Sequence, residues 1–488
     1  TADNNTAVGY QALEENTTAS NNTGVGAFAL TANTSGEANV AVGATSLDAN
    51  TTGTTNVAVG NNTLSSNTTA DGNTAVGHAA LEANTTGASN TATGYKSLQA
   101  NTTASNNAAY GLFALRVNTT GANNVAVGSS ALAANTTGSE NTALGANALD
   151  ANTTANDNTV IGYNALGANT TGASNSVLGA YALDGNTTGA NNVAIGRASL
   201  GANTTASNNT AVGYNALTAN TTGAENVAVG YLSLDANTTG AENVAIGTSA
   251  LSANTTAANN TAVGRMALRV NTTGAANTAL GHQAMISNTT ASDCTAVGKG
   301  ALGANTTGES NVAVGSQCLD ANTTGLNNTA VGRQALDNNT TGSANVAVGT
   351  NALDANTTAG NNTAVGEGSL KSNVVGNHSA ALGYNAGALT TGSRNTWIGA
   401  LCGDANTGGT GSVGVGYAAL TNSTGSNNTA LGGNAGDDIT SGSNNTFLGA
   451  GAESGSPSGA NRIVLGWTTA GTGDAHFTFG QGSGSDRV

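Results

Sequence analysis

The stretch N-V-A-V-G-A-T-S-L-D-A-N-T-T-G-T-T (39–55) recurs with small changes along most of the chain. Glycine recurs every 17 residues without a gap through Gly383, and a leucine follows each glycine by four residues as far as Leu370, with Met285 as the single replacement. Self-similarity at a fixed short period is the signature of a repeat architecture, so this period decides the fold. The first members of the two columns are Gly9, Gly26, Gly43, Leu13, Leu30 and Leu47.

The segment before each glycine has the alternation of a β-strand. Val40 and Val42 are two residues apart and would share one face, while Ala41 and Gly43 would share the other. A helix would need apolar residues at three- and four-residue spacings through a longer window, and the Gly, Asn and Thr content of each repeat defeats that pattern. The sequence therefore predicts a strand with one bulky and one small face.

A repeat of 17 residues is too short for a βαβ module and fits one coil of a parallel β-solenoid. We expect two short strands in each coil, one around T-A-V-G and one around x-A-L, joined by turns rich in Asn, Thr and Gly. Successive coils would stack about 4.8 Å apart. The predicted fold class is all-β, an elongated parallel β-solenoid or β-roll of 17-residue coils.

Two columns of asparagine accompany the repeat, and we predict that both form ladders along the stack. Identical side chains in register can bond amide to amide, and Asn also satisfies the backbone of its own turn. Because the stability of such a stack is roughly a sum over neighbouring coils, a single interruption at Cys294 should be tolerated. One column begins Asn16, Asn33, Asn50, Asn67 and the other begins Asn5, Asn22, Asn39, Asn56.

The repeat changes toward the end of the chain. Residues 1–376 form the regular shaft, residues 377–466 carry degenerate repeats of the same roll, and residues 467–488 are expected to form a C-terminal strand, a cap or a linker to another domain. Aromatic residues enter the degenerate part, and Phe477 and Phe479 alternate like a strand. The chain begins inside a repeat without the basic and apolar regions of a signal peptide, so we expect a fragment or processed piece.

Composition narrows the classes of function. Of 488 residues only 8% are charged and 3% aromatic, against roughly 25% charged in an ordinary globular domain, which argues against an enzyme. The net charge of −15 and the absence of a basic stripe argue against nucleic-acid binding. No apolar run approaches the 18 to 20 residues or so of a membrane helix, so no membrane insertion is expected.

No combination of reactive side chains predicts a catalytic, metal or cofactor site. The four histidines lie about a hundred or more residues apart, and Asp437 and Asp438 would point in opposite directions in a strand. The cysteines form no paired motif and are interpreted as packing thiols. No phosphate-binding loop or calcium-binding repeat is present. The histidines are His78, His282, His378 and His476, and the cysteines are Cys294, Cys318 and Cys402.

The N-T-T tripeptides have two alternative interpretations besides the turn ladder. They are acceptor sequences for N-glycosylation, but glycans on every coil would crowd one another at intervals of about 4.8 Å. The paired threonines, such as Thr17 and Thr18, are also typical of the flat arrays on ice-binding solenoids. The ladder is favoured and the ice-binding array stays open.

The units N-T-A-V-G-Y-Q-A-L (5–13), N-T-A-V-G-Y-N-A-L (209–217) and N-N-T-F-L-G-A-G-A (444–452) resemble the head repeats of YadA-type trimeric adhesins and, more closely, the repeats of tailed-phage fibre proteins. The tail F-T-F-G-Q-G-S-G-S-D-R-V (477–488) is similar to the stretch before the endosialidase-type intramolecular chaperone of such fibres. The resemblance implies a homotrimeric left-handed β-roll with the small Ala and Gly face between chains. The 17-residue unit is longer than the usual YadA head repeat, and a single-chain solenoid is also allowed.

The predicted function is that of a non-enzymatic structural fibre and adhesin, most simply the shaft of a phage tail fibre that reaches and binds a host surface. The alternatives are the head of a bacterial surface trimeric adhesin, an ice-binding solenoid and, last, a glycan-modifying enzyme. Expected partners are further copies of the chain, other tail or fibre proteins and a host receptor, polysaccharide included. The expected contact sites are the variable pairs after the glycine, such as Tyr10 and Gln11, Ala27 and Phe28, and Arg265 and Met266.

Overall fold

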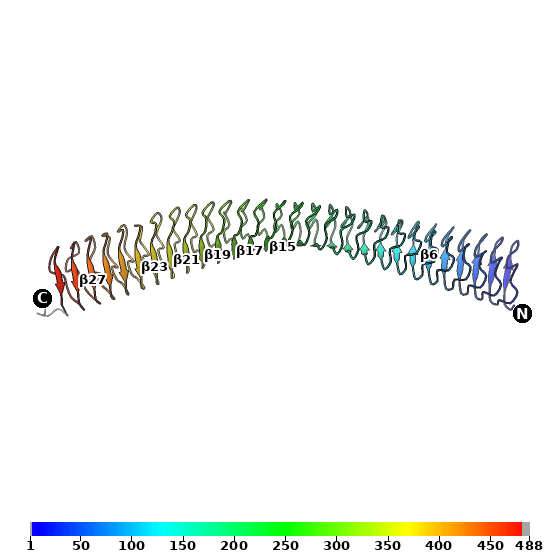
Figure 1. Ribbon diagram of the computed structural model, residues 1–488, viewed down its shortest axis with the longest axis horizontal. Helices are drawn as coiled ribbons and strands as arrows, with labels where there is room; N and C mark the ends of the chain where they lie inside the picture. The colour runs from blue at the N-terminus through cyan, green and yellow to red at the C-terminus, as the bar shows by residue number, and fades with distance from the viewer. Residues whose placement is uncertain (1, 481–488) are drawn as a thin grey trace. The chain divides into compact units, whose positions relative to one another are not determined.

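The computed structural model describes residues 2–480, and every regular element in this range is a β-strand. The chain divides into two compact units, Thr1–Asn243 (unit 1) and Val244–Val488 (unit 2), which are described separately. Each unit is a parallel β-solenoid in which every coil contributes one three-residue strand (Figure 1). The predicted solenoid fold is therefore confirmed.

Neighbouring strands within each unit pair in parallel with an offset of one repeat. Thr6 pairs with Thr23 in unit 1, and Thr261 pairs with Thr278 in unit 2, so each residue lies beside its counterpart in the next coil. The strands of unit 1 are β1 (Thr6–Val8), β2 (Thr23–Val25), β3 (Val40–Val42), β4 (Val57–Val59), β5 (Thr74–Val76), β6 (Thr91–Thr93), β7 (Ala108–Tyr110), β8 (Val125–Val127), β9 (Thr142–Leu144), β10 (Thr159–Ile161), β11 (Ser176–Leu178), β12 (Val193–Ile195), β13 (Thr210–Val212) and β14 (Val227–Val229). Those of unit 2 are β15 (Val244–Ile246), β16 (Thr261–Val263), β17 (Thr278–Leu280), β18 (Thr295–Val297), β19 (Val312–Val314), β20 (Thr329–Val331), β21 (Val346–Val348), β22 (Thr363–Val365), β23 (Ala380–Leu382), β24 (Thr396–Ile398), β25 (Val413–Val415), β26 (Thr429–Leu431), β27 (Thr446–Leu448), β28 (Ile463–Leu465) and β29 (Phe477–Phe479).

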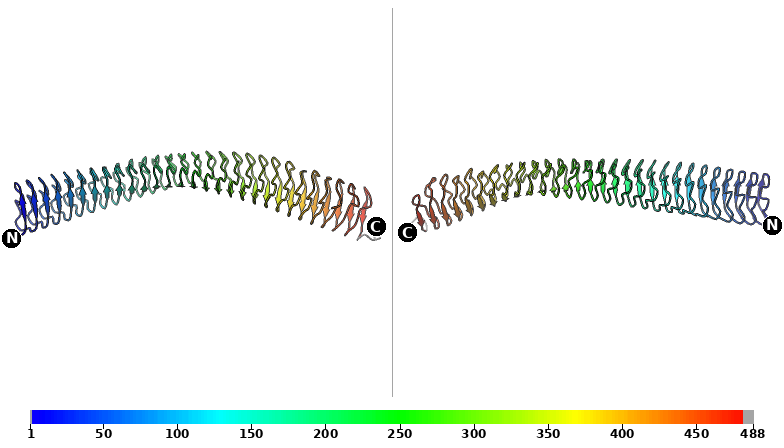
Figure 2. Two further views of the ribbon diagram at one scale, coloured as in Figure 1. Left: turned by 180° about the vertical axis from the view of Figure 1, so that it is seen from behind. Right: turned by 45° about the horizontal axis from the view of Figure 1, so that its top comes forward.

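The second strand expected around x-A-L does not form, and that prediction is wrong. Phe28, Leu30 and Leu47 have φ values of 65°, 52° and 51°, in the left-handed region that a strand cannot contain. The segment is instead a series of turns that closes the coil opposite the strand (Figure 2). Its backbone still bonds between coils, because the Leu30 N–H donates to the Ser46 carbonyl at 3.1 Å and the Phe28 N–H donates to the Tyr10 carbonyl at 2.8 Å.

In most coils the small face of the strand points into the coil and the bulky face points out of it. Ala41 is fully buried, whereas Val42 is 37% exposed. A Cβ atom added at Gly24, the equivalent inward position of the preceding coil, would lie 3.3 Å from Leu13 Cγ, so the interior is one side chain thick. The expectation that the Ala and Gly face lies between chains is therefore wrong, because this face is buried in the core of its own coil.

Both asparagine columns form the predicted ladders, but with different bonds. In the first column, Asn50 Nδ2 donates to Asn33 Oδ1 at 2.8 Å and to the Gly53 carbonyl at 3.0 Å. In the second column the backbone N–H of Asn39 donates to Asn22 Oδ1 at 2.9 Å, and its Nδ2 donates to Gly53 O at 2.8 Å. Most coils thus satisfy buried polar groups of their neighbours. The first ladder ends in unit 2 at Asn356, whose Oδ1 is buried without a hydrogen-bond partner.

The stack keeps its register at Cys294. The Cys294 backbone N–H keeps the column's bond to Asn277 Oδ1 at 3.0 Å, and its thiol contacts the Gly308 carbonyl at 3.3 Å in place of an amide. β18 on the same coil pairs with both of its neighbours in the usual register.

The glycine column is invariant for a steric reason. Gly26 has a φ of 139°, and a Cβ atom built on it would lie 2.4 Å from the carbonyl oxygen of Gly43. Since coils stack through this position, any side chain here would push the next coil away.

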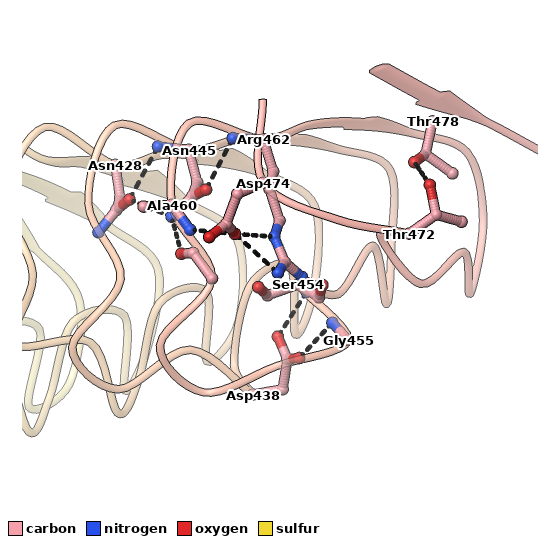
Figure 3. Close-up of polar contacts among 11 residues, drawn as sticks. Asn428, Asp438, Asn445, Ser454, Gly455, Ala460, Arg462, Thr472, Asp474 and Thr478 are labelled. Carbon is pink, nitrogen blue, oxygen red and sulfur yellow. Dashed lines mark hydrogen bonds and ion pairs between the residues drawn. The ribbon is translucent and has the colours of Figure 1, made fainter. Parts of the chain in front are cut away.

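The C-terminal coils of unit 2 are joined by an ion pair and by hydrogen bonds between side chains and backbone (Figure 3). Arg462 occupies the second asparagine column: its backbone N–H donates to Asn445 Oδ1 at 2.9 Å, and its guanidinium pairs with Asp474 at 2.8 Å. Asp438 accepts hydrogen bonds from the backbone N–H groups of Ser454 and Gly455 at 2.7 and 2.8 Å.

The strand predicted around the tail phenylalanines is confirmed as β29, which pairs in parallel with β28. The rest of the tail motif, residues 481–488, lies outside the described residues.

Candidate functional site

The residues of the predicted ladders build the frame of the coil and do not form a binding site. Asn5 and Asn16, in the first coil, are half-buried, and the other named ladder asparagines are fully buried. Leu30 and Leu47 are likewise fully buried, and Leu13 is 8% exposed.

In the N-T-T glycosylation sequons, the asparagine Nδ2 that would accept a glycan is already used in the hydrogen bonds of the ladder. Asn33 Nδ2, the atom that would carry a glycan, donates to Asn16 Oδ1 at 3.0 Å and to the Gly36 carbonyl at 2.9 Å. The side chain is fully buried, so the folded coil does not present it to a glycosyltransferase. This geometry supports the turn-ladder interpretation of the N-T-T tripeptides.

The outward side of the strands, here called the outer sheet face, is an apolar surface in each unit. The third residue of the strand is a large apolar residue in most coils, and many of these side chains are more than a third exposed. Contiguous exposed apolar residues, unlike scattered ones, mark an interaction surface. The exposed members at this position include Val8, Val42, Val76, Tyr110, Leu144, Ile161, Leu178 and Ile195 in unit 1 and Ile246, Leu280, Val331, Leu382, Ile398, Leu431 and Leu448 in unit 2.

A second surface, here called the glycine edge, consists of the two residues that follow the conserved glycine in each coil. Tyr10 and Phe28 are 68% and 39% exposed, and Arg265 is also exposed. Gln11, Ala27 and Met266 are partly exposed. All tyrosines of the chain except Tyr110 lie on this edge. The structure thus places the predicted contact positions at the surface.

The aromatic rings of the glycine edge contact one another from coil to coil. The rings of Tyr214 and Tyr231 are stacked, with centroids 5.6 Å apart and an interplanar angle of 13°. The Arg197 guanidinium lies over the Tyr214 ring, 5.8 Å from its centroid. Such aromatic and cation contacts along an exposed edge stabilise one another without burying the rings.

The densest group on the edge, here called the Tyr95 cluster, comprises His78, Tyr95, Lys96, Phe113 and Arg116. The Tyr95 ring stacks on His78 at 5.5 Å and meets Phe113 edge-on at 5.6 Å. Lys96 Nζ lies 5.5 Å from the Tyr95 centroid, and Arg116 Cζ lies 5.1 Å from the Phe113 centroid. Sequence reasoning missed this cluster. Sorting charged residues by repeat position would have found Lys96, but only the turn geometry brings Arg116 onto Phe113.

Carboxylates are kept to other edges of the coil. In unit 1 none of the acidic residues occupies either position of the glycine edge. Most of them follow the leucine column, as Asp48 and Glu82 do, or lie just before the second asparagine column, as Glu140 does. The coil surface of unit 1 is therefore divided by sign of charge.

The aspartates after the leucine column are half-buried, and burial raises their pKa. In unit 1 the pKa values of Asp48 and Asp235 are raised chiefly by desolvation, and one oxygen of each carboxylate is buried without a hydrogen-bond partner. In unit 2 desolvation also raises the pKa of Asp337, and the neighbouring carboxylates of Asp320 and Asp354 raise it further. The ionised form of these groups is thus disfavoured in the folded state.

This arrangement predicts that mild acid stabilises the solenoid. A carboxyl whose folded pKa is raised favours the folded state increasingly as pH falls from neutrality toward the ordinary aspartate value of 3.8. Asp474 acts oppositely, because the Ala460 N–H and Arg462 lower its pKa. We expect a higher melting temperature at pH 4.5 than at pH 7, and a smaller gain in the variant D320N/D337N/D354N. A melting temperature that falls between pH 7 and pH 4.5 would contradict this expectation.

The cysteines are packing thiols, as interpreted from the sequence. All three are buried, and desolvation raises the pKa of Cys294 to about 11 and those of Cys318 and Cys402 to about 12. They are therefore protonated at neutral pH and poor nucleophiles.

Unit 2 has a shallow notch of about 320 Å³ on its glycine edge. It opens where Gly300 and Gly303 lack the side chains found in most coils, and Gln283, Lys299 and Gln317 are among its lining residues. Ser287 and Asp320 also line the notch, but no hydrogen bond joins their side chains, and we assign the notch no chemistry.

Among residues 2–480, no group of three or more His, Cys, Asp or Glu side chains is arranged to hold a metal ion. The same residues include no apolar helix of membrane-spanning length. Neither a protein-family model nor a curated protein matches the chain. The functional proposal therefore depends on the repeat and on the surfaces described above.

Proposed function

We propose that the chain is a non-enzymatic structural fibre protein and adhesin, most simply the shaft of a tailed-phage tail fibre that attaches to a host surface. Its location would be the virion tail fibre, with the bacterial cell surface as the alternative. The resemblance of the repeats to those of phage fibres and trimeric adhesins supports this assignment, and so does the construction of the coil.

The observation that carries the proposal is the outer sheet face. Leu144, Ile161, Leu178 and Ile195 stand in consecutive coils of unit 1 and are each 37 to 48% exposed. Apolar columns of this kind favour association with a surface of the same periodicity, which a second copy of the chain supplies. A homotrimer would cover these columns on all three chains around one axis.

The mechanism proposed is mechanical and multivalent. Through most of each unit the coils bond to their neighbours through the strand, the turns and the two asparagine ladders, so the coils hold the glycine edge in a fixed register. A receptor-binding group repeated in several coils and three chains gains avidity without any single strong contact.

The proposal predicts that the purified chain is a trimer held by the outer sheet face. Light scattering after size exclusion should give the mass of three chains. Replacing Leu144 and Leu178 by lysine places charges in the proposed interface, and we expect this variant to be monomeric with an unchanged circular-dichroism spectrum. The matched control replaces the exposed Thr137 and Thr171, on a different edge of the same unit, by lysine and should remain trimeric.

A monomeric wild-type chain, or a trimer that survives L144K/L178K, would contradict the proposed assembly. Location is tested by immunogold labelling with an antibody to the chain: gold on virion tail fibres supports the phage assignment. Gold on uninfected bacterial surfaces would favour the adhesin alternative instead.

The threonine pairs give less support to ice binding. In most pairs the first hydroxyl is engaged within the protein, as Thr51 Oγ1 donates to the Thr68 carbonyl at 3.0 Å and Thr51 is half-buried. In these pairs the second threonine, such as Thr52, is the exposed one. In the first pair it is instead Thr18 Oγ1 that donates, to the Thr34 carbonyl at 3.4 Å. The face therefore offers one free column of hydroxyls, and the fibre proposal is preferred.

A further inference from the structure

We infer that the glycine edge of unit 1 binds an acidic polysaccharide, with the Tyr95 cluster as its principal site. The inference rests on the proposed function, attachment to a surface, and adds the chemical class of the ligand.

The charge distribution selects for an anionic ligand at this edge alone. The chain carries a net charge of −15, so an acidic polymer is repelled from most of its surface. On the glycine edge of unit 1 there is no carboxylate, while Lys96 and Arg197 lie on it and Arg116 reaches it. An acidic polymer thus meets attraction along one line of the coil.

The cations of the Tyr95 cluster are available to a ligand. The one ion pair among the described residues joins Arg462 and Asp474, so neither Lys96 nor Arg116 is neutralised by a carboxylate of the chain. Both are positioned by aromatic rings rather than by opposite charges. The carboxylate of Glu82, in the same column as Arg116 and two coils away, accepts a hydrogen bond from Gln99 Nε2 at 2.7 Å.

The rings of the cluster favour a sugar polymer over a simple polyanion. Tyr95 is 44% exposed, and it lies between His78 and Phe113 in adjacent coils. A pyranose ring has C–H groups on its faces, which pack on aromatic carbon, and hydroxyls at its rim, which bond to groups such as the Tyr95 hydroxyl and the His78 ring nitrogens. Uronic or sialic acid carboxylates would then reach Lys96 and Arg116.

Single-stranded nucleic acid also combines rings with negative charge, but it suits the chain less well. A phosphate at every nucleotide needs a continuous basic footprint, but unit 1 has only three basic residues: Lys96 and Arg116 in adjacent coils, and Arg197 several coils further on. Carboxylates spaced along a polysaccharide match one such pair of cations and a distant third cation better.

The test measures binding of the full chain to immobilised polymers by interferometry. The probes are hyaluronate, polygalacturonate and polysialic acid, with dextran, polyglutamate and oligothymidylate as comparisons. We expect at least one acidic polysaccharide to bind tenfold or more tightly than dextran and polyglutamate, with an affinity that falls as salt is raised. Failure of all three acidic polysaccharides, or tighter binding of oligothymidylate, would overturn the inference.

Variants locate the site. K96Q/R116Q and Y95A/F113A should each weaken binding of the acidic polysaccharide tenfold or more while the circular-dichroism spectrum is unchanged. The control K371Q/R394Q removes the same two charges from exposed positions off the glycine edge and should bind like the wild type. Undiminished binding by either cluster variant overturns the site. Trimers on virions without polysaccharide binding would leave the proposed function standing and refute only the ligand class.

Discussion

Replacing Trp397 by alanine is expected to lower the free energy of local unfolding in unit 2 by about 3–5 kcal/mol. Trp397 is fully buried and lies in the middle of β24, the inward position where most coils carry alanine. Its removal would leave a cavity in an interior that is only one side chain thick.

The cavity would be large because the residues around the indole are smaller than their counterparts in other coils. Gly387 and Gly403 stand where other coils carry the column leucine. A Cβ atom at either glycine would lie 2.4 Å from an indole carbon of Trp397. The indole therefore occupies the volume of two leucines, and nothing nearby replaces it after truncation. The same combination of a large inward residue and a glycine in the leucine column recurs further along the unit at Phe447 and Gly436. A Cβ atom added at Gly436 would lie 2.6 Å from Phe447 Cδ2.

Hydrogen exchange of residues 380–420 measures the effect, and a restoring variant makes it specific. Adding G387L and G403L to W397A rebuilds the consensus core, and the backbone is prepared because both glycines have φ of 61°, close to that of the column leucines. We expect the triple variant to recover most of the lost protection. G403L alone should be destabilising, because Trp397 still fills the space. Unchanged protection in W397A, or no recovery in the triple variant, would refute the size exchange.

The change Asn135→Asp is expected to cost about 3–5 kcal/mol of local stability in unit 1 at pH 7. Asn135 is fully buried in the first asparagine column. Its Nδ2 donates to Asn118 Oδ1 and to the Gly138 carbonyl, both at 2.8 Å, and its Oδ1 accepts from Asn152 at 2.9 Å. A carboxylate has the same shape but donates no hydrogen bond, so two oxygen atoms would face it unpaired.

The pH dependence of this variant follows from burial. The folded state raises the pKa of the new carboxyl, so the loss is fully present above that folded pKa and is relieved as pH falls toward the unfolded value near 3.9. Protonation also restores one donor toward Asn118. Hydrogen exchange across the neighbouring coils should therefore recover protection in acid.

The matched control is Asn191→Asp, which makes the same chemical change on an exposed side chain of the same unit. Equivalent positions in other coils carry Glu140 and Asp157, so we expect less than about 0.5 kcal/mol. Equal effects of N135D and N191D would show that the ladder does not stabilise the stack.

The repeat predicted the coil, its parallel register and the columns of Asn, Gly and Leu. It failed at the x-A-L segment, because apolar alternation over three residues does not distinguish a strand from turns with left-handed leucines. Leu30 adopts a φ of 52° because its burial and its inter-coil hydrogen bond outweigh a local preference of about 1–2 kcal/mol.

The sequence predicted the exposed positions of the candidate site but not the cluster of side chains on them. The two positions after each glycine were predicted to be exposed, and Tyr10 and Phe28 are. The Tyr95 cluster was not predicted, because its members come from three coils and from three repeat positions. Arg116 follows the leucine column, and only the turn between the leucine and the glycine edge brings it over Phe113.

The amino-acid sequence alone determined that like residues stack on like, since a strict period brings each side chain beside its own counterpart and buried amides then bond in register. Only the tertiary structure decided which face of the strand is inside. Alternation defines two faces of the strand but does not determine which one is buried. That depends on the width of the closed coil. Because the turns leave room for one leucine and little more, alanine is enclosed and valine, isoleucine and leucine face outward.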